Sequence, residues 1–122
     1  MVRIVVIDQD KELLDASYLI LEAKGYEVIT SNNLSDGQRI IEEKHPDLVI
    51  LDSTNTNRLD NFVLATKLKK ENTHLPIIMF KTINMEIGID DEKHVDDFIV
   101  KPISPSELIS KIDRNLLLSI QE

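Results

Sequence analysis

The stretch Pro46-Asp47-Leu48-Val49-Ile50-Leu51-Asp52 decides the fold. Its four consecutive apolar residues have the length of a strand buried on both faces, which is typical of a parallel sheet. The run ends in a single carboxylate, Asp52, and a polar turn begins directly after it. Because ligands of open α/β sheets bind at the carboxyl ends of the strands, Asp52 is the first candidate functional residue.

Four more short apolar runs resemble this strand, and segments with helical spacing lie between them. The five expected strands cover residues 3–7, 26–30, 48–51, 77–80 and 98–100. The expected helices cover residues 11–24, 32–44 and 82–95, with two more that begin at Asp60 and after Ser104. Segment 82–95 has the least regular pattern, because Met85, Ile87 and Ile89 follow no clear period.

The alternation of strands and helices predicts one domain over residues 1–122, with a parallel sheet covered by helices on both faces. Helix starts are marked by Asp10, which can act as an N-cap, and by the capping box Ser104-Pro105-Ser106-Glu107. All five strands of such a sheet end at one edge. The charged residues expected at that edge are Asp8, Asp52, Lys81 and Lys101.

The composition excludes several functional classes. The chain has 122 residues, 42% of them hydrophobic, and a formal net charge of -8, which argues against nucleic-acid binding through phosphate contacts. It has no cysteine, which excludes disulfides and thiolate metal sites, and its histidines lack metal-ligand spacing. Because no apolar run has membrane-spanning length and the N-terminus lacks a signal-peptide pattern, we expect a soluble cytoplasmic protein without membrane insertion.

The motifs at the strand ends resemble those of the receiver domain of two-component response regulators, over essentially the whole chain. They are Val6-Ile7-Asp8, Pro46-Asp47-Leu48-Val49-Ile50-Leu51-Asp52, Leu75-Pro76-Ile77-Ile78-Met79 and Asp96-Asp97-Phe98-Ile99-Val100-Lys101-Pro102. Each motif alone is common, and their joint occurrence carries the resemblance. The fold that it implies is a flavodoxin-like, doubly wound five-stranded parallel sheet in the order 2-1-3-4-5.

The resemblance also implies a chemistry. Asp52 would accept a phosphoryl group from a histidine kinase or phosphotransfer protein, and Lys101 would contact a phosphoryl oxygen. A Mg²⁺ ion would be held by Asp8, Asp52 and the backbone carbonyl of Thr54. The peptide bond that joins Lys101 to Pro102 would be cis, in the manner of the family.

Some positions depart from the family pattern. Gln9 stands where the family usually has a second acid, so it offers Mg²⁺ an amide oxygen but no charge. Lys81 stands where the family has a switch hydroxyl, and Thr82 follows one residue later. The loop after Asp52 has neither proline nor glycine before the next helix. The aromatic switch position, by contrast, is retained as Phe98.

These departures predict a weakened affinity for Mg²⁺. Asp8 and Asp52 are balanced by Lys81 and Lys101, so the formal charge of the pocket is zero, whereas the family pocket is usually negative. Lys81 could pair with Asp52 and oppose phosphorylation, or it could point into solvent without effect, and both alternatives stay open. Asp10 could supply the missing acid, although we favour its role as a helix cap.

Three functions remain to be weighed. The first is a phosphoaccepting receiver that is not an enzyme beyond slow self-dephosphorylation, and that changes a surface formed by the fourth helix, fifth strand and fifth helix. That surface would contact an effector domain or form a homodimer. The second is a pseudo-receiver that docks proteins without phosphate. The third, a small α/β enzyme or nucleotide-binding protein, is disfavoured because the acidic turn 8–12 has no glycine to cradle a phosphate.

Overall fold

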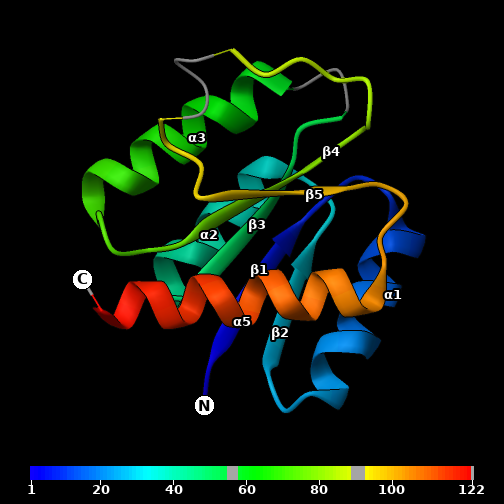
Figure 1. The fold of residues 1–122 in the computed structure, drawn as a ribbon. Helices are drawn as coiled ribbons and strands as arrows, with labels where there is room; N and C mark the ends of the chain where they lie inside the picture. The colour runs from blue at the N-terminus through cyan, green and yellow to red at the C-terminus, as the bar shows by residue number, and fades with distance from the viewer. Residues whose placement is uncertain (55–57, 89–92, 122) are drawn as a thin grey trace.

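The computed structural model describes residues 1–54, 58–88 and 93–121, and within them the elements alternate as expected (Figure 1). The strands are β1 (Arg3–Ile7), β2 (Glu27–Ser31), β3 (Leu48–Asp52), β4 (Ile77–Lys81) and β5 (Asp97–Val100). The helices are α1 (Lys11–Ala23), α2 (Leu34–Lys44), α3 (Arg58–Glu71) and α5 (Pro105–Gln121). All strand pairs are parallel, in the order β2-β1-β3-β4-β5, so the predicted topology is confirmed.

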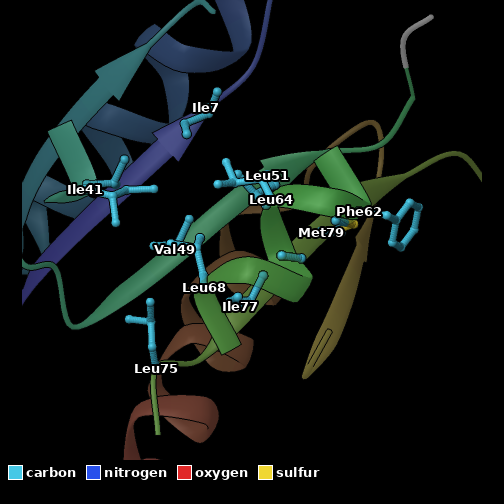
Figure 2. Close-up of a cluster of buried hydrophobic side chains, with 12 residues drawn as sticks. Ile7, Ile41, Val49, Leu51, Phe62, Leu64, Leu68, Leu75, Ile77 and Met79 are labelled. Atoms are coloured by element: carbon cyan, nitrogen blue, oxygen red, sulfur yellow. The ribbon is translucent and has the colours of Figure 1, made fainter. Parts of the chain in front are cut away.

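The sheet has a hydrophobic layer on each face, because its strands carry apolar residues on both sides. Ile4 and Val6 of β1 point into the layer covered by α1 and α5, which includes Leu21 and Ile112. The layer on the other face is covered by α2 and α3. Figure 2 shows this second layer, formed by Val5, Ile7, Ile41, Val49, Leu51, Phe62, Leu64, Ala65, Leu68, Leu75, Ile77 and Met79.

Side-chain caps set the starts of three helices. The Asp10 carboxylate accepts a hydrogen bond from the Leu13 amide at 3.2 Å, which confirms its expected role as the N-cap of α1. Asn33 caps α2 in the same way, so that helix begins two residues later than the pattern suggested. Ser104 accepts from the Glu107 amide at 3.4 Å, as the capping box predicts.

The helix expected over residues 82–95 is wrong in the part of this segment that the structure describes. Residues 82–88 and 93–95 form turns and irregular backbone, and the Met85 amide donates to the Thr82 carbonyl at 3.1 Å in one of these turns. Residues 89–92 lie outside the described part. The physical reason is the missing apolar period together with Gly88, since a helix gains its stability mainly by packing a continuous apolar stripe. Ile87 and Val95 instead reach the α2/α3 layer from irregular chain.

None of the helices in residues 1–54, 58–88 and 93–121 is long and apolar enough to cross a membrane. The candidate functional residues lie at the carboxyl ends of the strands. Asp8 follows β1, Asp52 ends β3, Lys81 ends β4 and Lys101 follows β5. Because the strands are parallel, the fold brings these four residues to the same edge.

Candidate functional site

Two buried carboxylates share one ammonium group at this edge. Asp8 and Asp52 are each only 3% exposed. The Nζ atom of Lys101 lies 2.8 Å from Asp8 Oδ2 and 3.1 Å from Asp52 Oδ1. Asp8 and Asp52 come from the neighbouring strands β1 and β3, whereas Lys101 follows β5 at the end of the sheet. The long lysine side chain makes this contact possible across β4.

Backbone and ring contacts hold Lys101 in that position. Its amide donates to the carbonyl of Lys81 at 2.8 Å, which extends the pairing of β4 and β5 by one hydrogen bond. Its ammonium also lies 5.6 Å from the ring centroid of Phe80, within the range of a cation–π interaction. The side chain is therefore directed over a buried aromatic ring toward the carboxylates rather than into solvent.

One oxygen of the Asp52 carboxylate is closely surrounded. Asp52 Oδ1 accepts hydrogen bonds from the Thr54 amide at 3.0 Å and from the Thr54 hydroxyl at 2.6 Å. The ammonium of Lys101 donates to the same hydroxyl at 3.1 Å. No described residue donates a hydrogen bond to the other oxygen, Oδ2. Thr54 thus contributes its amide and hydroxyl to the site in addition to the carbonyl that the resemblance singled out.

Asp8 has a less favourable environment for its charge. Its Oδ1 atom accepts from the Asp10 amide at 2.9 Å. Its Oδ2 atom is buried and has no hydrogen-bond partner among the described residues, although the Lys101 ammonium lies 2.8 Å from it. Burial raises the pKa of Asp8 above its ordinary value and the Asp52 charge adds to this, although Lys101 and the Asp10 amide lower it. Burial also lowers the pKa of Lys101, but its two carboxylate partners outweigh this and leave the pKa raised.

The donor atoms at this edge fit a hard divalent cation in part. Asp8 Oδ2 is a buried oxygen without a hydrogen bond, and the carboxylate and carbonyl oxygens of Asp52 and Thr54 are the ligand types that Mg²⁺ prefers. However, the described residues contain no group of three or more acidic or histidine side chains placed to hold a metal. Lys101 lies between the two carboxylates and would compete with a cation for them.

The remaining predicted residues lie around this centre. Gln9 is exposed, next to the buried Asp8. Thr82 is exposed as well. The Lys101–Pro102 peptide bond is cis, as the resemblance led us to expect. Of the residues predicted to hold Mg²⁺, Asp8 and Asp52 are buried together at this edge and Thr54 contacts Asp52, whereas the Gln9 side chain is exposed.

Lys81 follows neither of the two alternatives that the sequence left open, which were an ion pair with Asp52 and a side chain that points into solvent. Its ammonium lies 5.7 Å from the ring centroid of Phe98 on β5, two residues before Val100, which is the strand partner of Lys81. Within the described chain it forms no ion pair with Asp52. Phe98 itself is half-buried and packs against the α2/α3 layer. Lys81 and Phe98 therefore form a pair beside the carboxylate site.

Sequence reasoning missed two buried polar residues. The hydroxyl of Ser53 donates to the Phe80 carbonyl at 2.5 Å, and the Ser53 amide donates to the same oxygen at 3.1 Å. The side-chain amide of Asn61, in the first turn of α3, donates to the backbone carbonyl of Asp52. In the sequence, Ser53 and Asn61 are simply polar residues next to apolar ones. That pattern is too common to predict a buried hydrogen bond.

Replacing Asp8 with Asn is expected to raise the free energy of unfolding at pH 7 by about 1 kcal/mol. Because its pKa is raised in the folded state, the stability that Asp8 contributes is full below its unfolded pKa and is lost as the pH rises through its folded pKa. The gain of Asp8→Asn should therefore shrink as the pH falls toward the ordinary Asp value of 3.8. Urea denaturation of the native protein and the variant, at pH 7 and near pH 3.8, measures this gain in the free energy of unfolding.

The matched control is Asp15→Asn, which neutralises an exposed acid on α1. It should change stability by less than about 0.5 kcal/mol at either pH. A destabilised Asp8→Asn variant at pH 7 would contradict this prediction. It would mean that the attraction of Lys101 exceeds the cost of burying the Asp8 charge.

Comparisons with known proteins agree with this fold. The sequence profile of the response regulator receiver domain matches residues 4–113. The structure is similar to NtrX from Brucella abortus, at 30% identity and a TM-score of 0.88 over 99% of this chain and 28% of that one. It is also similar to the isolated receiver domain of that NtrX, at 30% identity and a TM-score of 0.82 over 93% of this chain and 97% of that one.

A third similar structure is a CheY-like receiver domain protein from Methanospirillum hungatei JF-1. It is 25% identical, with a TM-score of 0.85 over 99% of this chain and 98% of that one. Both the profile match and the structural similarity agree with the receiver-type fold that the strand-end motifs predicted. The chain belongs to the receiver domain family of two-component response regulators.

Proposed function

We propose that Asp52 accepts a phosphoryl group from a histidine kinase or a phosphotransfer protein. The observation that carries this proposal is the Lys101 ammonium, 2.8 Å from Asp8 and 3.1 Å from Asp52 at the edge of the sheet. Such a cation can stabilise the charge that develops on a transferring phosphoryl group. The domain would act as a phosphoacceptor rather than an enzyme, with at most slow hydrolysis of its own aspartyl phosphate.

In this reaction an oxygen of Asp52 attacks phosphorus, and the bond from phosphorus to the donor nitrogen breaks as the new bond forms. Oδ2 is the oxygen available for attack, because Oδ1 accepts the amide and hydroxyl of Thr54. Lys101 contacts both the carboxylate and the Thr54 hydroxyl, so a small movement would bring its ammonium to a phosphoryl oxygen.

Receiver domains generally bind Mg²⁺ at the phosphorylation site. Here Asp8, Asp52 and the backbone carbonyl of Thr54 would hold the ion, which would neutralise charge on the phosphoryl oxygens. We expect its affinity to be weaker than is usual in the family. Gln9 supplies no charge, and Lys101 already occupies the space between the two carboxylates.

The output would begin at the Lys81–Phe98 pair. Phosphorylation adds negative charge at Asp52, which lies on the strand next to β4. That charge would attract the Lys81 ammonium away from the Phe98 ring and change the packing of β5. The surface that responds would consist of β5, α5 and the β4–β5 connection with Thr82. It would contact an effector domain or a second copy of the chain. The match covers only 28% of the NtrX chain, so in that protein a domain of this kind is joined to a longer polypeptide.

The direct test is the intact mass of the protein after incubation with acetyl phosphate and Mg²⁺. We expect a gain of one phosphoryl group in the native protein and no gain in Asp52→Asn. A receiver of known activity, treated in parallel, serves as the positive control. If only that control is labelled at every Mg²⁺ concentration, the proposal fails.

A second candidate, a pseudo-receiver that docks proteins without phosphate, is favoured by one observation. The Lys101 ammonium contacts both Asp8 and Asp52 and neutralises one of their two negative charges, so the carboxylates have a cationic partner in the protein itself. On this alternative, Asp52→Asn keeps both the fold and the signalling output. Loss of output in a folded Asp52→Asn variant would exclude the pseudo-receiver and support phosphorylation.

A further inference from the structure

The backbone carbonyl of Asp52 lies at the edge of the sheet, where the hydrogen-bonded pairing of β3 with β1 has ended. The register between β1 and β3 ends at Ile7 and Leu51, so Asp52 has a strand partner on β4 but none on β1. A buried carbonyl without a donor is costly. The side-chain amide of Asn61 donates to this carbonyl and replaces the missing strand partner.

Asn61 is well suited to hold that carbonyl in one place. Its side chain is 4% exposed, so its amide has little access to water that could compete for the hydrogen bond. It belongs to α3, which is fixed to the sheet by Leu64, Ala65 and Leu68 in the α2/α3 layer. Leu64 belongs to the same buried cluster as Leu51 of β3, one residue before Asp52, and Figure 2 labels both. The donor therefore lies on a rigid element, anchored next to the strand that it contacts.

The carbonyl that Asn61 holds belongs to the peptide that leads to Ser53. On the far side of this peptide, the Ser53 amide and hydroxyl both donate to the Phe80 carbonyl on β4. The Asp52–Ser53 peptide is thus held from α3 and from β4 at once. The orientation of this peptide sets the position of Thr54, the next residue in the chain. The Thr54 amide and hydroxyl both donate to Asp52 Oδ1.

We propose that Asn61 is a positioning residue for the phosphoacceptor: by holding the Asp52 carbonyl, it sets the orientation of the Asp52 carboxylate and of Thr54. This inference rests on the proposed function, because Asp52 is the phosphoacceptor and the Thr54 carbonyl is a proposed Mg²⁺ ligand there. Groups that orient metal ligands without touching the metal commonly change its affinity by about 10- to 100-fold. Asn61 would therefore act on the site without contacting phosphate.

The test compares Asn61→Ala with Asn115→Ala. Asn115 is the control, since it is 5% exposed and also donates its side-chain amide to a backbone carbonyl, that of Lys111, at 2.7 Å. The same amide donates to the Asp97 carboxylate at 3.0 Å, and Asn115 lies on α5, away from Asp8 and Asp52. Each variant loses at least one buried hydrogen bond, so both should lower the melting temperature by about 5 °C. Asn61→Ser, which keeps a shorter donor, provides a second and milder variant.

Two readouts separate positioning from stability. The first is the Mg²⁺ dissociation constant, from amide chemical shifts during a Mg²⁺ titration; it should rise about tenfold in Asn61→Ala and stay within twofold in Asn115→Ala. The second needs no metal. Hydrogen exchange of the Thr54 amide should be about tenfold faster in Asn61→Ala and unchanged in Asn115→Ala, with Asn61→Ser between the native protein and Asn61→Ala.

Equal behaviour of Asn61→Ala and Asn115→Ala in both readouts would overturn the inference and leave Asn61 a structural residue. If Asn61→Ala does not fold, Asn61→Ser decides in the same way, since native values in both of its readouts overturn the inference. The proposed function is tested separately. If the native protein neither binds Mg²⁺ nor accepts phosphate from acetyl phosphate, that function fails, and the Thr54 exchange comparison still decides whether Asn61 positions Asp52.

Discussion

Lys101→Met is expected to lower the initial rate of Asp52 phosphorylation by acetyl phosphate about 100-fold. Removing one preorganised donor that stabilises a developing oxyanion commonly costs this factor or more. Among the side chains that the structure describes, the Lys101 ammonium is the cation paired with the acceptor carboxylate, at 3.1 Å, and methionine keeps most of its apolar length over the Phe80 ring. The loss should therefore come from the charge rather than from packing.

The rate is measured as intact mass against time at saturating Mg²⁺, and Lys111→Met is the matched control. Lys111 also lies between two carboxylates, 3.5 Å from Asp97 and 3.4 Å from Glu107, but on the α5 side of the sheet. Its variant should be labelled at close to the native rate. A native rate in Lys101→Met would mean that Lys101 stabilises the resting carboxylates and does not act on the phosphoryl group.

Lys101→Met should also make Asp8 harder to ionise. Without the ammonium, Asp8 keeps its burial and its repulsion by Asp52, both of which raise its pKa, and it loses the largest opposing effect. The destabilisation caused by Lys101→Met at neutral pH should therefore be smaller when Asp8→Asn is already present. A thermodynamic cycle of the two substitutions measures this coupling.

The meeting of Asp8, Asp52 and Lys101 could be predicted from the sequence because it follows from topology. Parallel strands place their carboxyl ends at one edge, and the strands themselves were recognisable as apolar runs between helices. The caps at Asp10 and Ser104 could be predicted for a similar reason, since a cap depends on residues only three positions apart. Local and topological rules therefore reached most of the fold and the centre of the site.

The parts that could not be predicted depend on contacts between distant side chains. The position of Lys81 is one case, because a flexible lysine can reach a carboxylate, a ring or solvent from the same strand end. Asn61 is another, since its hydrogen bond depends on how α3 packs against β3. The helix expected after β4 failed for a different reason. Ile87 and Val95 pack partly buried against the α2/α3 layer from irregular chain while Ile83 is exposed, and no periodic rule describes that arrangement.

Phe80→Ala is expected to lower the free energy of unfolding by about 3–5 kcal/mol, the usual cost of truncating a buried aromatic residue. Phe80 is 0% exposed and belongs to the layer under α1 and α5. Natural domains have only about 5–15 kcal/mol in total, so this variant should be close to unfolding at 37 °C. Urea denaturation followed by circular dichroism measures the loss.

Phe80→Leu separates the volume of this ring from its aromatic face. Leucine fills most of the space, so the loss of stability should be well below that of Phe80→Ala. It removes the ring over which the Lys101 ammonium lies at 5.6 Å, so any fall in the phosphorylation rate of this folded variant reports the loss of that support. If Phe80→Ala cost less than about 1 kcal/mol, the layer would have collapsed into the cavity. Phe80 would then not be the fixed surface on which Lys101 is directed toward Asp52.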